Sequence, residues 1–92
     1  MIRNIAHKGL RRFFLEGSKA GIQPNHAERL QSVLARLNTA ATIEDVRFPG
    51  SGLHALESSL KGHWAVTISG NWRVTFRFEN GDAFEVNYQD YH

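Results

Sequence analysis

The sequence predicts a single α+β domain over residues 1–92. The expected order is an opening strand, two amphipathic helices and an antiparallel meander of three or more strands, with the helices packed on one sheet face. Three observations lead to this prediction. Apolar and polar residues alternate through residues 71–78, as in a strand with one buried face. Two further alternating stretches flank that strand, and two earlier segments have apolar residues at helical spacing.

The first half of the chain predicts a short strand and two helices. Residues 1–6 have two isoleucines among polar neighbours and fit an opening edge strand. Residues 7–16 predict a helix that Gly17 ends, and a second helix follows from Pro24, which favours a first helical turn. In both helices apolar residues recur every three or four positions and predict a buried side. These residues are Leu10, Phe13 and Phe14 in the first helix and Ala27, Leu30, Val33, Leu34 and Leu37 in the second.

The segment between the helices and the meander is predicted to be largely irregular. Thr42 is a candidate cap for a short turn over residues 43–46. Residues 48–52, which include two glycines and a proline, predict a loop. Residues 53–56 are too few to classify by periodicity.

The alternation also predicts which residues pair across the meander. Residues directly opposite in an antiparallel pair share a face, so apolar residues are expected to oppose apolar residues. This rule requires three-residue loops at 69–71 and 79–81, with Gly81 in the left-handed conformation, rather than a tight turn at Asn80 and Gly81. The expected pairs are Val66 with Val74, Ile68 with Trp72, Phe76 with Phe84, Val74 with Val86 and Trp72 with Tyr88.

The polar face of the meander is predicted to carry a cluster of functional groups. In the expected register Arg73 lies between Thr67 and Asn87, at the end of the sheet from which the last residues emerge. Those residues include a carboxylate, a phenol and an imidazole, from Asp90, Tyr91 and His92. The competing interpretation is an ordinary cross-strand ion pair, because Arg73 and Arg77 both lie diagonal to Glu85 in this register.

Other residues are predicted to be structural. The pattern assigns Arg77 a structural role, places Trp64 and Trp72 in the core, and leaves His63 on the polar face without a role.

Composition excludes several classes of protein. The absence of cysteine excludes disulfides and thiolate zinc sites, and the five histidines show no paired-ligand spacing, so neither a metal nor another cofactor is expected. No signal peptide or long apolar run is present, and a cytoplasmic protein is expected. Residues 1–47 hold eight Lys or Arg and four Asp or Glu, against three and five in residues 48–92. The basic first half suggests contact with nucleic acid or an acidic partner.

Four short motifs resemble those of a known family. They are Leu53-His54-Ala55-Leu56, Gly62-His63-Trp64, Asn71-Trp72-Arg73 and Tyr88-Gln89-Asp90-Tyr91-His92. Together with the order of elements, they make the whole chain resemble the HigB toxins of bacterial toxin-antitoxin modules, a branch of the RelE/ParE superfamily. The resemblance implies a ribosome-dependent mRNA endonuclease that acts in the ribosomal A site and inhibits translation. It also implies a HigA-like helix-turn-helix antitoxin, through which alone operator DNA is contacted, and no membrane partner.

The residues fit metal-free cleavage of RNA by its own 2'-hydroxyl. That reaction needs proton transfer and stabilisation of extra negative charge on phosphate oxygens. The Arg73 guanidinium offers a planar donor fork for phosphate, and Tyr91 is expected to stack on a base or orient the phosphate. Candidates for proton transfer are His54, Asp90 and His92. Lys61 and Asn71 are predicted RNA contacts.

Two other functions remain open alternatives. One is non-enzymatic inhibition of DNA gyrase of the ParE kind, and the other is a role as an antitoxin-bound co-repressor with weakened catalysis. Glu57 favours them, because HigB relatives have a lysine at that position and the nearest cation here is Lys61. His54 and the Asp-Tyr-His end favour the endonuclease, since a pure binding module has no need of proton-transfer groups beside an arginine.

Overall fold

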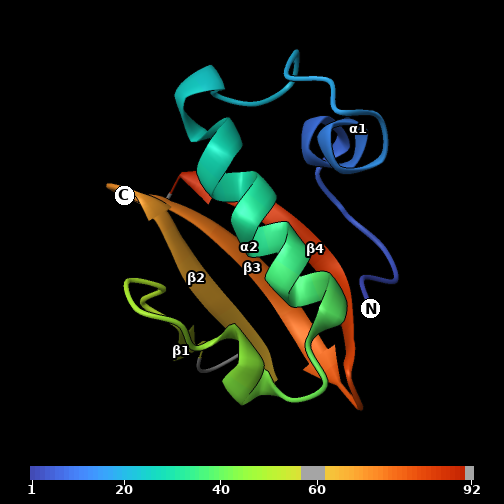
Figure 1. The fold of residues 1–92 in the computed structure, drawn as a ribbon, viewed down its shortest axis with the longest axis vertical. Helices are drawn as coiled ribbons and strands as arrows, with labels where there is room; N and C mark the ends of the chain where they lie inside the picture. Colours follow the sequence, from blue (N-terminus) through green and yellow to red (C-terminus); the bar gives the residue numbers. More distant parts are fainter. Residues whose placement is uncertain (57–61, 91–92) are drawn as a thin grey trace.

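The computed structural model describes residues 1–56 and 62–90 (Figure 1). Within these residues, two helices precede a four-stranded antiparallel sheet whose strands lie in chain order, which confirms the α+β class. The elements are α1 (Lys8–Glu16), α2 (Ala27–Thr39), β1 (His54–Ala55), β2 (His63–Ser69), β3 (Trp72–Glu79) and β4 (Asp82–Asp90), with short 3-10 helices at Pro24–His26 and Ile43–Val46. Three predicted site residues, Lys61, Tyr91 and His92, lie outside the described residues.

The first six residues do not form the predicted opening strand. Two isolated parallel bridges instead join this segment to β4, and they pair Ile2 with Ala83 and Ile5 with Val86. Between these bridges the backbone N–H of Glu85 donates to the side-chain oxygen of Asn4 at 2.5 Å. Glu85 has a φ of 54° and lies where the register of β4 shifts at a β-bulge. The bulge interrupts the ladder, so the segment follows the edge of β4 without becoming a strand.

Helix α1 begins and ends within one residue of the prediction. Its N-cap is His7, whose Nδ1 accepts a hydrogen bond from the backbone N–H of Leu10 at 3.0 Å. Its C-cap is Gly17, with a φ of 77° that side chains with a Cβ rarely adopt. Leu10 is fully buried, and Phe13 and Phe14 pack partly buried against the core. The predicted apolar side of this helix therefore faces inward.

The His7 cap is expected to make stability depend on pH. Burial lowers the pKa of the His7 imidazole below its ordinary value of 6.5. A protonated Nδ1 cannot accept from Leu10, so folding favours the neutral ring. Because the folded pKa lies below the unfolded one, the contribution of the cap, at most about 1 kcal/mol, is complete above the unfolded pKa. It is lost as the pH falls through the folded pKa.

Urea denaturation at a series of pH values from about 7.5 to 5 measures this loss. The matched variant is His7→Ser, which keeps a capping oxygen but does not titrate. We expect the variant to lose less stability than the wild type over this range. Equal losses in the two proteins would show that the cap does not titrate.

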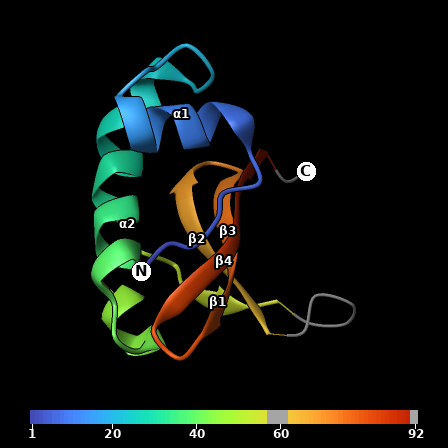
Figure 2. The same cartoon turned by 90° about the vertical axis from the view of Figure 1, so that its right-hand side faces the viewer.

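The core lies between the helices and one face of the sheet. Helix α2 lies across that face, and α1 crosses near the N-terminal end of α2 (Figure 2). Fully buried strand residues on this side include Val66, Val74 and Phe76, and Trp64 and Trp72 pack partly buried against them, as predicted. The helix residues in this core are Leu10, Ala27, Leu30, Val33, Leu34 and Leu37.

In the connection from α2 to the sheet, the predicted cap and short turn are present. Thr42 caps the short helix Ile43–Val46, and it does so in a capping box with Asp45. The reciprocal hydrogen bonds account for the low pKa of Asp45, because the backbone N–H groups of Thr42 and Ala41 donate to its carboxylate.

The turn between β3 and β4 differs from the prediction. Glu79 pairs with Asp82, so Asn80 and Gly81 form a two-residue turn and the predicted three-residue loop is wrong. Both turn residues have positive φ, 49° and 82°, as a type I′ turn requires. The pairs predicted between these strands are replaced by Arg77 with Phe84, Phe78 with Ala83 and, beyond the bulge, Val74 with Tyr88 and Trp72 with Asp90.

Phe84 consequently lies on the face opposite to the predicted one. The Arg77 guanidinium carbon lies 4.4 Å from the centre of its ring. Ala83 takes the core position instead and is fully buried. A shift of one residue in register moves side chains between faces. The tight turn therefore exchanges Phe84 for Ala83, and the bulge then returns Val86 and Tyr88 to the core.

The β2–β3 hairpin follows the prediction along the strands but not at the turn. Two predicted pairs are present, Val66 with Val74 and Thr67 with Arg73. The pair of Ile68 with Trp72 is wrong, because the register shifts and Ser69 pairs with Trp72. The turn consists of Gly70 and Asn71 rather than three residues. Arg73, the second residue of β3, thus lies close to a tight turn.

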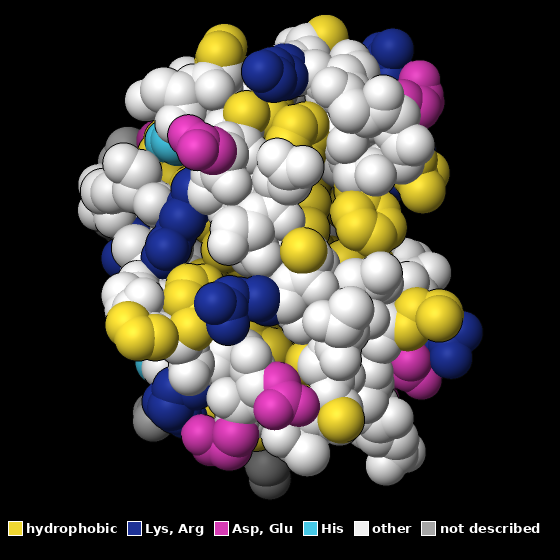
Figure 3. Space-filling model, in the orientation of Figure 1, with side chains coloured by type: hydrophobic (Ala, Val, Ile, Leu, Met, Phe, Trp, Pro, Cys, Tyr) yellow, Lys and Arg dark blue, Asp and Glu magenta, His cyan; other side chains and the backbone are white. Residues whose placement is uncertain are grey.

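The surface of the helical side carries its basic residues apart from one another. In Figure 3, Lys and Arg side chains on this side are separated by apolar and uncharged groups, and Asp and Glu side chains are scattered over the same view. The basic excess of the first half is therefore spread over this side. Neither helix of the described residues is long and apolar enough to cross a membrane.

Candidate functional site

His54 is positioned by a loop held against β2. The backbone N–H of Thr67 donates to the carbonyl of Ser51 at 2.8 Å, and Arg29 of α2 donates to the carbonyl of Thr67 at 2.9 Å. Gly52 has a φ of 60°, and a Cβ there would lie 2.6 Å from Thr67 Oγ1. Only glycine allows this close approach. The loop leads directly into β1, which pairs His54 with β2.

The hydrogen bond made by His54 determines which ring nitrogen is available to a substrate. The side chain is exposed, and its Nδ1 lies 2.9 Å from the carbonyl oxygen of Gly52. Because a carbonyl oxygen only accepts, Nδ1 donates and carries a proton. In the neutral ring the lone pair is then on Nε2, which suits it to exchange a proton with bound RNA.

Arg73 lies on the face of the sheet opposite α2, which we call the reverse face. Its Nη1 donates to the backbone carbonyls of Gly70 at 2.6 Å and Trp72 at 3.1 Å. Both acceptors are uncharged, so these contacts place no negative charge against the guanidinium, which has further N–H groups for a phosphate. The side chain is half-buried beside the β2–β3 turn. These contacts orient a cation without neutralising it.

Arg77, which was predicted to be structural, makes the cross-strand ion pair to Glu85 that was considered for both arginines, and a second one. It pairs with Glu79, and its Nε lies 3.7 Å from Glu85 Oε2. Its guanidinium also stacks on Phe84. The cross-strand ion pair to Glu85 therefore belongs to Arg77 and does not account for Arg73.

Gln89 is a neighbour of Arg73 that sequence reasoning missed. It pairs with Arg73 across β3 and β4, where Asn87 was predicted. Its Nε2 donates to Thr75 Oγ1 at 3.0 Å, and Thr75 is buried. The predicted register was two residues out at this point, because the tight turn and the bulge at Glu85 each shift β4 by one residue. The Asn-Gly dipeptide was the available signal, since a tight turn followed by one bulge gives this register.

The end of β4 is anchored from the core side by Tyr88. Its hydroxyl lies 2.5 Å from Nδ1 of the buried His26 and accepts from the backbone N–H of Gln23 at 3.4 Å. Its ring lies 4.6 Å from that of Trp72. Burial raises the pKa of the Tyr88 phenol, against a smaller opposite effect of the Gln23 N–H, so the phenol remains neutral. These contacts hold the strand two residues before Asp90.

Asp90 and Asn71 lie at the same end of the sheet as Arg73. Asp90 pairs with Trp72, next to the pair of Arg73 with Gln89, and Asn71 lies in the preceding turn. Both residues are exposed. Asp90 is one register position from Arg73. Because successive positions of a strand alternate between the two faces, Asp90 falls on the face opposite Arg73 and not in a row of the reverse face.

His54 and Arg73 occupy adjacent rows of the reverse face. His54 pairs with Ala65, which pairs with Thr75, whereas Arg73 pairs with Thr67 one row nearer the turn. Two strand spacings and two residues along a strand separate their backbones by roughly 12 Å. The two side chains do not meet across this gap. A phosphate-bearing substrate bound there would lie between a proton-transfer group and a cation.

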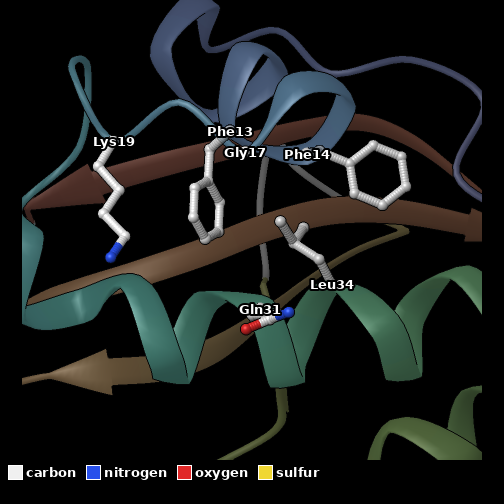
Figure 4. Close-up of a pocket in the computed structure, with 6 residues that line it drawn as sticks. All are labelled: Phe13, Phe14, Gly17, Lys19, Gln31 and Leu34. Carbon is white, nitrogen blue, oxygen red and sulfur yellow. The ribbon is translucent and has the colours of Figure 1, made fainter.

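The groove between α1 and α2 is lined by residues of other types than the site around His54 and Arg73 (Figure 4). It has a volume of about 330 Å³ and is lined by Phe13, Phe14, Gly17, Lys19, Gln31 and Leu34. None of these side chains is a carboxylate or imidazole, so the groove lacks the groups for proton transfer at neutral pH. Within residues 1–56 and 62–90, no three His, Asp or Glu side chains are grouped as a metal site would require.

Comparisons with known proteins agree with these features. The family described as "RelE-like toxin of type II toxin-antitoxin system HigB" matches residues 3–92. The chain is 38% identical over 92 residues to a protein of Proteus vulgaris named "Endoribonuclease HigB", and the alignment covers all of both chains.

Proposed function

The chain belongs to the HigB-like family of RelE-like toxins of type II toxin-antitoxin systems, and we propose that it is a ribosome-dependent endoribonuclease. It inhibits translation by cutting mRNA in the ribosomal A site. The observation that supports this most directly is the placement of His54 and Arg73 on one sheet face across a substrate-sized gap. The name of the Proteus vulgaris relative supports the same activity.

In the proposed reaction the RNA cuts itself with the help of the protein. The 2'-hydroxyl attacks the adjacent phosphorus, the bond to the 5'-oxygen breaks, and a cyclic phosphate and a 5'-hydroxyl result. Arg73 binds the non-bridging oxygens, whose negative charge grows in the transition state. Proton transfer to and from the two hydroxyl oxygens is shared among His54, Asp90 and His92.

The remaining predicted residues bind RNA in this proposal. Tyr91 stacks on a base or orients the phosphate, and Lys61 and Asn71 contact the RNA. Asn71 is exposed in the turn directly before β3, two residues from Arg73. The scheme needs neither a metal ion nor another cofactor.

The partner expected for a type II toxin is a cognate antitoxin. We infer that it is a HigA-like protein with a helix-turn-helix domain, and that the toxin contacts operator DNA only through it. A protein that acts on translating ribosomes works in the cytoplasm, without a membrane partner.

Glu57 favours a second candidate function. A carboxylate where HigB relatives have lysine would repel phosphate, as expected of a non-enzymatic gyrase inhibitor or a co-repressor. Glu57 lies outside the described residues.

Toeprinting of a translated message with the purified protein tests the proposal. We expect cuts within the codon in the A site, and little cutting of the same RNA without ribosomes, because site residues rather than a long basic channel hold the RNA. Equal cutting without ribosomes would contradict ribosome dependence. Gyrase poisoning without RNA cutting would favour the second candidate.

A further inference from the structure

We propose that a cavity on the reverse face, beside Arg73, holds one nucleobase of the mRNA next to the scissile phosphate. This inference rests on the proposed function and adds a base-binding site to it. The cavity has a volume of about 220 Å³, below the about 300 Å³ at which pockets for drug-sized ligands begin. It has room for a single base rather than a dinucleotide. Its lining includes Leu56, His63, Thr75, Glu85, Asn87 and Gln89.

The position of the cavity suits a base attached to a phosphate at Arg73. Gln89, which lines the cavity, pairs directly with Arg73. The adjacent cross-strand pair, Thr75 with Asn87, also lines it. Neighbouring pairs of the same face lie roughly 7 Å apart along a strand. A nucleotide with its phosphate at Arg73 therefore has its base within reach of the cavity.

Two lining amides are oriented by hydrogen bonds within the protein. Gln89 Nε2 donates to Thr75 Oγ1 at 3.0 Å, and Asn87 Oδ1 accepts from the backbone N–H of Tyr88 at 2.9 Å. These bonds use one of the two N–H groups of Gln89 and one lone pair of the Asn87 oxygen, and they leave the other end of each amide open. The groups left for a ligand are an acceptor, Gln89 Oε1, and a donor, Asn87 Nδ2. A donor beside an acceptor is the pattern by which side chains recognise the edge of a base.

His63 adds a polar atom that lacks a partner. Its Nε2 donates to Glu85 Oε2 at 3.1 Å, so the neutral ring has its lone pair on Nδ1. That Nδ1 is buried and has no hydrogen-bond partner in the described structure. An unpaired buried acceptor is unfavourable in a folded protein, but this atom has almost no accessible surface and is therefore not a contact for a ligand in this structure. The pair made by His63 and Glu85 thus forms a polar wall of the cavity.

The backbone conformation of Glu85 supports the same site. Its φ of 54° lies in the left-handed region, which is unfavourable for residues other than glycine. Such strain concentrates at functional sites. The bulge at Glu85 also places Asn87 and Gln89 in the rows of Thr75 and Arg73. One irregularity therefore positions both the carboxylate partner of His63 and the two amides.

The test is the sequence preference of cleavage on ribosomes programmed with messages randomised at the A-site codon. The main variant is Asn87→Ala, which removes the proposed donor. We expect it to reduce the wild-type preference at one position beside the cut by about tenfold, as the loss of one base contact predicts. The rate should fall on preferred codons and persist on disfavoured ones.

A matched pair of variants separates base binding from the ion pairs of this face. Glu85→Gln changes the carboxylate in the cavity, whereas Glu79→Gln makes the same change at a partner of Arg77 that does not line the cavity. We expect only the first to weaken the preference. Thermal unfolding of each variant controls for stability. An unchanged preference in Asn87→Ala, or an equal loss of rate on every codon, would overturn the proposal.

A second measurement is independent of cleavage. The side-chain amide signals of Gln89 and Asn87 are followed by NMR while the isolated protein is titrated with each ribonucleoside 5'-monophosphate. We expect at least one nucleotide to shift both signals in the wild type and to leave the Gln89 signal of Asn87→Ala unchanged. No shift with any nucleotide would overturn the base site. A wild type that binds a nucleotide but cuts no message on ribosomes would contradict the proposed function instead.

Discussion

Arg73→Ala is expected to abolish ribosome-dependent cleavage and growth inhibition while leaving the fold intact. Removing one group that stabilises transition-state charge typically lowers the rate about 10²- to 10³-fold. The bonds of Arg73 to the carbonyls of Gly70 and Trp72 lie at the sheet surface. Their loss should change the free energy of unfolding by less than about 1 kcal/mol. Cleavage rates on ribosomes and thermal midpoints measure the two effects.

Three further variants control this experiment. Phe76→Ala empties a fully buried position and should destabilise the protein by about 3 to 5 kcal/mol. Arg77→Ala removes an arginine from the same face and strand and should retain cleavage, because its partners are Glu79, Glu85 and Phe84. Arg73→Lys keeps the charge without the planar fork and should cut at an intermediate rate. A toxic Arg73→Ala, or one that unfolds as readily as Phe76→Ala, would assign Arg73 a structural role.

Deleting Tyr91 and His92 is expected to abolish cleavage without unfolding the protein. Both residues belong to the predicted catalytic group, and loss or displacement of such groups lowers rates steeply. The core extends only as far as Tyr88, and β4 ends at Asp90. The deletion therefore removes no residue of the described core. Ribosomal cleavage, circular dichroism and affinity for the antitoxin are measured on the same preparation, and only the first should change.

Single substitutions distinguish the two deleted residues. Tyr91→Phe keeps the ring for stacking and loses the hydroxyl, whereas His92→Gln keeps hydrogen bonding and loses proton transfer near neutral pH. We expect the second to be the more damaging. If the shortened chain still cuts RNA, the chemistry belongs to the groups that remain, His54, Arg73 and Asp90. If it fails to fold, the final residues stabilise the sheet.

The local pattern of the sequence predicted most elements of the fold. The apolar spacing of Leu10, Phe13 and Phe14 indicated α1, and Gly17 indicated its end, because helices are determined by contacts between near neighbours. The opening strand was the exception. Residues 1–6 lie along β4 but make only isolated bridges, because the bulge at Glu85 interrupts the ladder. A bulge on a partner strand leaves no mark in the sequence of the segment itself.

The candidate site was predictable in part. His54 and Arg73 share the reverse face, and Thr67 is the predicted neighbour of Arg73. Gln89 was missed, and Asn87 was placed one row away from its actual position. His63 was assigned no role, although it lines a cavity with Glu85. The two errors of register, at Gln89 and Asn87, lie in β4, beyond the turn at Asn80 and Gly81.

The sequence by itself determined that Val66, Val74, Val86 and Tyr88 face the core, because alternation with period two requires them to share a face. It could not determine the register of β4. A three-residue loop, and a tight turn followed by a bulge, both return Val86 and Tyr88 to that face, and their registers differ by two residues. The tertiary structure decided between them, because the Asn4 side chain receives the N–H of Glu85 at the bulge. That contact joins residues far apart in the chain, and it places Gln89 rather than Asn87 beside Arg73.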